Sequence, residues 1–311
     1  MKTKVVILGA GHVGSHVAWA LAAGGVCDEI VLVDKLPGQA AAQASDIADS
    51  VSFSSHCPMV REGTYADCAD ADITVCAIGK AREPGQTRLD LLGDSVRMIH
   101  ELARQLGAAP LKGLVISITN PCDIIADCLR RALGMDPTRC FGTGTLLDTA
   151  RLIRILSEQT GAPRAEIQAV ALGEHGDSSM IPFSGIRIQG RKAEDMPGFD
   201  AQIALCRTHQ TGMDIINGKG STEFGIGRAA AHLIQTILTD TDRVLPLSVT
   251  LRGEYGVQDI ACGVPCRIGR NGVRQVIELP LTERERAAFD ASIAVLSQYT
   301  ELAKQYENEL K

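Results

Sequence analysis

A histidine near two glycines is the residue of this sequence best suited to acid–base chemistry. His175 stands between Gly173 and Gly176, directly after the apolar run at 169–172, which predicts a buried strand. Glycine lets the backbone turn tightly, so the imidazole stays accessible at the strand end, where it can exchange a proton near neutral pH. A lone histidine in a surface loop is the alternative, so the remaining chain must supply a carboxylate partner and a substrate anchor.

Two charged residues on a predicted helix match those needs. The helix begins at Leu146, and Asp148 and Arg151 lie three positions apart, so they share a helix face. A solvated ion pair is the simpler interpretation of this spacing. The functional interpretation is a buried carboxylate for His175 beside a guanidinium that fixes a substrate carboxylate.

Further arginines lie in a polar segment between a predicted strand and a predicted helix. This segment, Gly79–Arg88, is bounded by glycine and rich in charge, which suits a mobile lid. Arg82 and Arg88 would then face a ligand when the lid closes. Solvated arginines are the alternative here.

A glycine-rich turn, G-x-G-x-x-G, follows the apolar strand at 5–8 and opens a helix. Gly9 makes the tight turn, Gly11 lets the backbone approach a pyrophosphate, and Gly14 allows close helix–strand packing. Asp34, 20 positions after the last glycine, would accept hydrogen bonds from ribose hydroxyls and repel a 2′-phosphate, which favours NAD over NADP. The predicted cofactor-binding residues are Gly9, Gly11, His12, Val13, Gly14, Asp34, Gly79 and Asn120.

The elements that position these residues alternate between strand and helix. We expect helices at 13–23, 40–52 and 88–106, and strands at 5–8, 29–33, 72–78 and 114–118. Such alternation predicts an α/β fold with a doubly wound parallel sheet, on which ligands bind at the carboxyl ends of strands. Gly9, Asp34, Gly79 and Asn120 all fall at such ends.

The second half has a different pattern, and we place the boundary between domains 1–142 and 143–311. Helices are expected at 201–216 and 222–238, and strands at 181–188, 247–251 and 265–279. Asn271-Gly272 predicts a hairpin with a type I′ turn, and Thr282 with Glu285 predicts a capping box at the start of the last helix. This half is therefore expected to be α+β with antiparallel strands.

Composition excludes several classes of protein. The 311-residue chain has a net charge of −6 and no basic stripe, so nucleic acid is not an expected partner. No apolar run approaches the roughly 18 residues that span a membrane, and the N-terminus enters a strand at once, so we expect a cytoplasmic protein without a signal peptide. The ten cysteines are scattered, which indicates reduced thiols. His12 and His16 lack further ligands nearby, so no metal site is expected.

Taken together, these motifs resemble the lactate/malate dehydrogenase family over essentially the whole chain. The motifs GAGHVG, PGQTR, ITNP, LLDTAR and GEHGDS occur in family order, with Asp34 among them. The resemblance implies a Rossmann domain followed by a catalytic domain. It also implies NAD as cofactor, an oxidoreductase acting on the CH–OH group of L-2-hydroxy acids, and a homo-oligomer, either a dimer or a tetramer.

The resemblance also implies a role for each site residue. His175 matches the acid/base histidine and Asp148 its carboxylate partner, while Arg151 matches the arginine that grips the substrate carboxylate. Arg88 matches the lid arginine that polarises the carbonyl, and Asn120 the asparagine that positions it. Thr222 matches a threonine at the side-chain end of the pocket.

The specificity positions point to different substrates. Arg82 occupies the position where malate enzymes have arginine and lactate enzymes glutamine, and an unpaired charge over a methyl group is costly. Glu174 and Thr222 look lactate-like, and Glu83 could neutralise Arg82. The sequence therefore slightly favours malate and oxaloacetate, with L-lactate dehydrogenase, or a related L-2-hydroxy acid, as the alternative.

Several positions of the sequence bear on regulation and on other classes of protein. Ile153 and Gln168 stand where relatives activated by fructose 1,6-bisphosphate carry charged residues, so activation by this compound is not expected. A non-catalytic NAD-binding module would not need the residues around His175. An NAD-dependent glycoside hydrolase would need a metal site of cysteine and histidine, which is not evident in the sequence.

Overall fold

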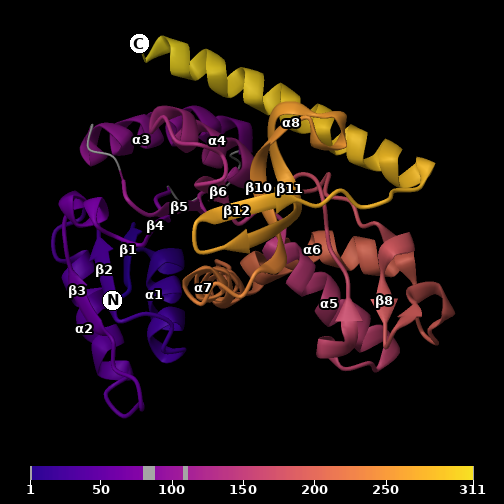
Figure 1. Ribbon diagram of the computed structural model, residues 1–311, viewed down its shortest axis with the longest axis horizontal. Coiled ribbons are helices and arrows are strands. Elements are labelled where there is room, and N and C mark those ends of the chain that lie inside the picture. The colour runs from indigo at the N-terminus through magenta and orange to yellow at the C-terminus, as the bar shows by residue number, and fades with distance from the viewer. Residues whose placement is uncertain (1, 80–87, 108–110, 311) are drawn as a thin grey trace.

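The first half of the chain is an alternation of strands and helices (Figure 1). The computed structural model describes residues 2–79, 88–107 and 111–310, so Arg82 and Glu83 lie outside the described residues. The elements of this half are β1 (Lys4–Leu8), α1 (His12–Ala23), β2 (Glu29–Val33), α2 (Gln39–Ser50), β3 (Met59–Glu62), β4 (Ile73–Cys76), α3 (Arg88–Leu106), β5 (Leu114–Ser117), α4 (Cys122–Ala132) and β6 (Cys140–Gly142).

Six of these strands form a parallel sheet in the order β3-β2-β1-β4-β5-β6. The chain order reverses at β1, which pairs on one side with β2 and on the other with β4. The inner strands β1, β2, β4 and β5 are almost entirely buried and largely apolar, as expected when helices cover both faces. The predicted doubly wound sheet is confirmed, and its reversal at β1 is where such folds bind ligands.

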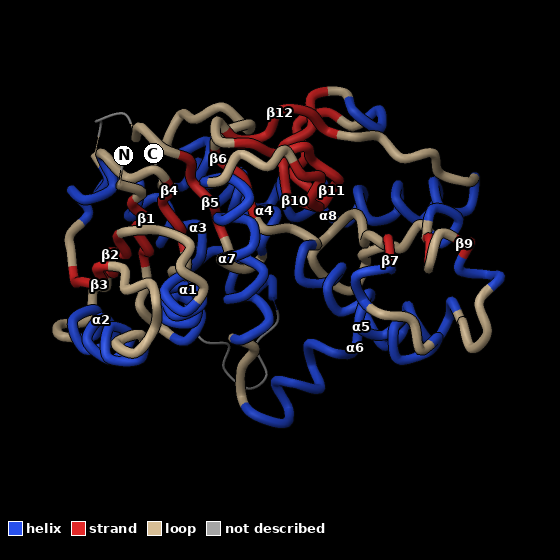
Figure 2. Tube along the Cα trace, turned by 60° about the horizontal axis from the view of Figure 1, so that its bottom comes forward, coloured by secondary structure: helices blue, strands red, loops and turns tan. Residues whose placement is uncertain are grey.

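The second half adds antiparallel strands to this same sheet. Its elements are α5 (Leu146–Thr160), β7 (Ile167–Gln168), β8 (Arg187–Ile188), β9 (Arg191–Lys192), α6 (Ala201–Lys219), α7 (Phe224–Leu238), β10 (Arg243–Arg252), β11 (Gln258–Gly269), β12 (Gly272–Val276) and α8 (Glu283–Glu309), with short 3₁₀ helices between several of them. Strand β10 pairs with β6 through Ser248 and Gly142, so the described residues give a nine-stranded sheet that ends at β12. Figure 2 shows this row of strands, with β7 and β9 apart from it beside α5 and α6.

Three local predictions for the second half were wrong. Ile181–Ile188 is not one strand: a 3₁₀ helix occupies Phe183–Gly185, because Pro182 cannot donate to a ladder. The run at 169–172 forms only an isolated bridge between Leu172 and Met180. The hairpin at β11–β12 is present, but its turn is not the predicted type I′. The pairing ends at Gly269 and Gly272, so Arg270 and Asn271 are the central residues, and neither has the positive φ that type I′ requires.

Helices cover both faces of the large sheet. Helices α3, α4 and α8 contact one another on one side, and α1 packs against α7 on the other, as Figure 1 shows. The predicted capping box starts α8: Glu285 N–H donates to Thr282 Oγ1 at 3.3 Å and Thr282 N–H to Glu285 Oε2 at 2.9 Å. A second, smaller apolar core joins α5, α6 and β7–β8.

All ten cysteines are free thiols. Within the described ranges, no helix is long and apolar enough to cross a membrane.

Candidate active site

The structure brings His175 and Asp148 together. Asp148 lies in the first turn of α5, and its Oδ2 is 2.5 Å from His175 Nδ1. The loop that carries His175 is fixed by its own backbone, since Gly173 exchanges two hydrogen bonds with Gly263 of β11, at 2.9 and 2.7 Å. Gly173 has a φ of 87°, a conformation that favours glycine. The imidazole is therefore held in one orientation, with Nδ1 on the carboxylate.

The charges of this pair support each other in a buried place. Burial opposes the charge on His175, but the neighbouring Asp148 carboxylate outweighs it and raises the pKa of the imidazole above its ordinary value of 6.5. Burial likewise opposes the charge on Asp148, yet His175 and Arg151 hold the pKa of the carboxyl below its ordinary value. The pair therefore favours an imidazolium beside a carboxylate, which is the state that can donate a proton.

A second carboxylate, which sequence reasoning missed, also contacts His175. Asp123 in the first turn of α4 accepts a hydrogen bond from the backbone N–H of His175 at 2.8 Å. Only 2% of Asp123 is exposed, and burial raises the pKa of its carboxyl to about 6. Its other oxygen, Oδ1, has no hydrogen-bond partner among the described residues. An acidic residue inside the apolar stretch at 122–129 was the signal that could have identified it.

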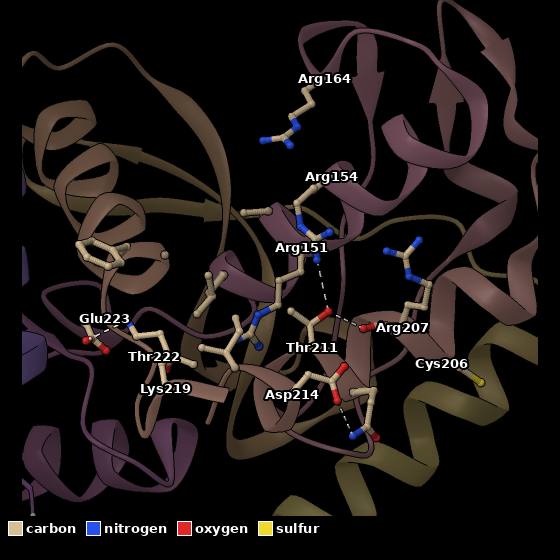
Figure 3. Close-up of a pocket in the computed structure, with 16 residues that line it drawn as sticks. Arg151, Arg154, Arg164, Cys206, Arg207, Thr211, Asp214, Lys219, Thr222 and Glu223 are labelled. Atoms are coloured by element: carbon tan, nitrogen blue, oxygen red, sulfur yellow. Dashed lines mark hydrogen bonds and ion pairs between the residues drawn. The ribbon is translucent and has the colours of Figure 1, made fainter. Parts of the chain in front are cut away.

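Arg151 lies beside this dyad and opens onto a cavity of about 900 Å³ (Figure 3). Its Nη1 donates to Asp148 Oδ1 at 3.1 Å, and its side chain is 12% exposed. Helix α6 covers the guanidinium, since a Cβ built at Gly212 would lie 3.5 Å from both terminal nitrogens. Thr222, between α6 and α7, lines the same cavity, whereas His175 does not. A guanidinium fixed in this way is suited to a two-point grip on a carboxylate.

The glycine-rich turn has the packing that its motif predicts. Gly9 has a φ of 98°, and a Cβ there would lie 2.7 Å from the Ala77 carbonyl oxygen. A Cβ at Gly14 would lie 1.8 Å from the Gly9 carbonyl oxygen, so only glycine fits. A Cβ at Gly11 would meet no atom within 4 Å. The open space is therefore at Gly11, the position that a pyrophosphate would approach.

The predicted cofactor residues gather at one end of the sheet. A cavity of about 310 Å³ is lined by Gly9, Gly11, Asp34 and Gly79, among others. Asp34 is fixed there, because its two oxygens accept from Ala10 N–H at 2.7 Å and Leu36 N–H at 2.9 Å. These residues fit the adenosine part of a dinucleotide, with the carboxylate placed for ribose hydroxyls.

Three other predicted residues lie at the same end of the sheet. His12 and Val13 form the first turn of α1, whose N-terminus faces the glycine turn. Asn120 follows β5, next to the strand that precedes Gly79, and the Asn120–Pro121 peptide bond is cis. Their positions agree with a site that spans the ends of β1, β4 and β5.

The two lid arginines are not placed by the structure. Arg82 lies outside the described residues, and Arg88 is described only as the first residue of α3, so its side chain is not placed. In the described part of the chain, no group of three or more histidine, cysteine, aspartate or glutamate residues could hold a metal ion.

Known proteins resemble this chain over its full length. The family model described as lactate/malate dehydrogenase, NAD binding domain, matches residues 3–142, and the model of the alpha/beta C-terminal domain matches residues 145–307. The chain is 41% identical to L-lactate dehydrogenase of Fusobacterium nucleatum subsp. nucleatum, over 98% of each chain. It is 36% identical to L-lactate dehydrogenase 3 of Bacillus cereus, over 95% of this chain and 96% of the relative.

Solved structures give the same family. Minor L-lactate dehydrogenase from Enterococcus mundtii has a TM-score of 0.93 at 31% identity and covers 97% of this chain and 98% of its own. Malate dehydrogenase from Picrophilus torridus has a TM-score of 0.94 at 27% identity, with both chains fully covered. With the dyad, the fixed guanidinium and the dinucleotide turn in place, this chain belongs to the lactate/malate dehydrogenase family of NAD-dependent oxidoreductases acting on CH–OH groups.

Proposed function

We propose that this chain is an L-lactate dehydrogenase, which interconverts pyruvate and L-lactate with NAD. The observation that carries the proposal is the 41% identity to an L-lactate dehydrogenase over 98% of both chains. The geometry supports it, because an acid/base dyad and a carboxylate anchor lie side by side at Asp148, His175 and Arg151. One guanidinium and one proton donor are the minimum that a 2-oxo monocarboxylic acid requires.

The residues divide the reaction between them. The turn at Gly9–Gly14 would hold NADH, which would supply the hydride that the carbonyl carbon takes up. Arg151 holds the substrate carboxylate, which orients the carbonyl toward His175. Because His175 Nδ1 is engaged by Asp148, Nε2 is the nitrogen that gives the proton to the carbonyl oxygen. Asp148 stabilises the imidazolium before this transfer and fixes the tautomer after it.

A malate dehydrogenase is the second candidate, and Arg82 favours it. An arginine over the far end of the substrate would pair with a second carboxylate, which oxaloacetate has and pyruvate lacks. The malate dehydrogenase of Picrophilus torridus is a close structural neighbour, although at 27% identity. The curated relatives at 36–41% identity outweigh this single residue and favour lactate.

The experiment that tests the proposal compares kcat/KM for pyruvate, oxaloacetate and longer 2-oxo acids, with NADH as reductant. We expect pyruvate to be preferred, and Arg82→Gln to increase that preference. One charge-assisted pair contributes about 1.5–3 kcal/mol, or roughly 10- to 150-fold. If the unmodified enzyme prefers oxaloacetate by such a factor and Arg82→Gln reverses the order, the chain is a malate dehydrogenase. If no 2-oxo acid is turned over while NADH binds, the chain is a non-catalytic binding module.

A further inference from the structure

A serine on the C-terminal helix α8 contacts the loop that carries His175. Ser292 Oγ accepts a hydrogen bond from the backbone N–H of Glu174 at 2.8 Å, one position before the histidine. Only 1% of Ser292 is exposed, and a Cβ built at Gly173 would lie 2.4 Å from Ser292 Oγ. The helix therefore reaches the loop at its backbone, and glycine at position 173 allows this close approach.

The same serine belongs to a closed ring of hydrogen bonds. Ser178 Oγ lies 3.1 Å from Ser292 Oγ and 2.5 Å from Glu174 Oε2. A carboxylate only accepts, so Ser178 gives its single hydroxyl proton to Glu174. Ser292 then donates to Ser178 while it accepts from the Glu174 N–H. The ring begins at the backbone of Glu174 and ends at the carboxylate of the same residue.

This ring encloses the segment that holds the acid/base histidine. His175 lies between Glu174 and Ser178, and its own N–H donates to Asp123 of α4 at 2.8 Å. Two successive peptide N–H groups, at positions 174 and 175, are thus bound by side chains from two different helices. Hydrogen bonds that share a hydroxyl also polarise and strengthen one another. The place of the imidazole beside Asp148 follows from a backbone that is fixed in this way.

We propose that Ser292 is a positioning residue for the acid/base reaction, because it holds the His175 loop on α8 through this ring. Its hydrogen bonds in the described structure go to the loop, and none goes to the imidazole, so it acts through the loop. This inference rests on the proposed function, since it concerns the proton transfer assigned to His175. A loosened loop would separate the imidazole from Asp148 and slow that transfer, whereas Arg151 on α5 would still bind the substrate carboxylate.

The kinetic test uses Ser292→Ala and Ser292→Thr in the full-length enzyme. Thr300→Ala is the matched control, because Thr300 is a buried hydroxyl residue further along α8 and lies outside the ring. We expect kcat for reduction of the oxo acid to fall roughly 10- to 100-fold in Ser292→Ala, with KM within about twofold. Ser292→Thr keeps the hydroxyl and should recover most of the lost rate. In Thr300→Ala, kcat should stay within about twofold even if the thermal midpoint falls.

A pH profile separates positioning from a loss of stability. Asp148 and Arg151 of α5 and Asp123 of α4 face His175. Burial lowers the pKa of the imidazole, but the contact with Asp148 outweighs it. If that contact loosens, the pKa of His175 falls, so the fall of kcat/KM for reduction with rising pH should begin at lower pH in Ser292→Ala. Ser292→Thr and Thr300→Ala should keep the profile of the unmodified enzyme.

Amide hydrogen exchange, followed by mass spectrometry without substrate, tests the ring independently of the substrate. Peptides that cover residues 173–178 should exchange roughly tenfold faster in Ser292→Ala and unchanged in Thr300→Ala. Ser178→Ala opens the ring from the loop, at a half-buried position, and should give a smaller change in the same direction, also if Ser292→Ala does not fold.

The outcomes distinguish this proposal from the proposed function. If no 2-oxo acid is turned over, the proposed function fails, and faster exchange in the serine variants still supports the ring. The proposal is overturned if exchange at 173–178 is unchanged in the serine variants, or if Ser292→Ala keeps the kcat and the pH profile of Thr300→Ala.

Discussion

Two carboxylates act on His175 from different directions, Asp148 at the ring and Asp123 at the peptide nitrogen. His175→Asn removes the proton donor but leaves the cofactor turn untouched. We expect the rate of reduction to fall by roughly 10²- to 10⁴-fold, the range of general acid catalysis. NADH affinity, measured by fluorescence titration, should stay the same. A variant that keeps a tenth of the activity would show that another group donates the proton.

Because the pKa of His175 is raised, the direction in which the rate of reduction changes with pH can be predicted. The donor is the imidazolium, so kcat/KM for reduction should be constant below the folded pKa of His175 and fall as pH rises through it. Because Asp148 raises that pKa above 6.5, the fall should occur at higher pH than for a free imidazole. A rate that stays constant from about pH 5 to 9, with chemistry limiting, would contradict the assignment.

Asp123 is expected to act as a positioning residue through His175. Its charge is among those that raise the pKa of His175, so Asp123→Asn should move the falling limb of the pH profile to lower pH. Asp127→Asn is the matched control, because Asp127 is buried on the same helix but pairs with Arg130. Asp127→Asn should lower the stability of the protein and leave the falling limb of the pH profile at the same pH. If Asp123→Asn lowers the rate equally at every pH, its role is structural only.

The residues found from the sequence are those with a local motif around them. His175, Asp34 and the glycines each stand in a short segment whose spacing reflects its chemistry. Asp123 belongs to no such local motif. It contacts His175 only because α4 and the 173–176 loop meet in the fold. Contacts between segments 52 positions apart depend on packing, which a single sequence does not reveal.

At the scale of elements, the glycine turn offers a matched pair of substitutions. Gly14→Ala places a Cβ against the Gly9 carbonyl, so α1 must shift from β1, at a cost of about 1–3 kcal/mol. Gly11→Ala meets only open space, so stability should be unchanged while NADH binds roughly tenfold more weakly. Thermal unfolding and NADH titration of both variants check this. Equal effects of the two on stability would refute the packing argument.

The boundaries of helices and strands were predictable where a capping residue or a clear periodicity of apolar residues marks them. Helix α3 spans Arg88–Leu106 and α8 follows the capping box, both as predicted. Ile181–Ile188 failed because its apolar pattern resembles a strand, although Pro182 and the neighbouring loop decide its backbone. Short apolar runs outside the parallel sheet depend on tertiary pairing that the sequence pattern does not specify.

At the scale of the whole molecule, the surface near Ile153 and Gln168 bears on regulation. Both residues line a cavity of about 670 Å³ whose other lining residues are largely apolar. Neither side chain supplies a positive charge to a phosphate. We therefore expect fructose 1,6-bisphosphate at millimolar concentration to give no activation in steady-state assays at saturating or limiting oxo acid. A clear activation of the unmodified enzyme would contradict this prediction.

The sheet that continues from β6 to β10 limits how this chain can be taken apart. The predicted boundary at residues 142 and 143 falls where Gly142 pairs with Ser248, so the two halves share one ladder of backbone hydrogen bonds. A fragment cut there would leave β6 as an open edge, prone to pair with other molecules. A chimaera of two relatives, made to alter NAD selectivity, would therefore need junctions placed outside this region. One parent would have to supply β6, α5 and β10 together.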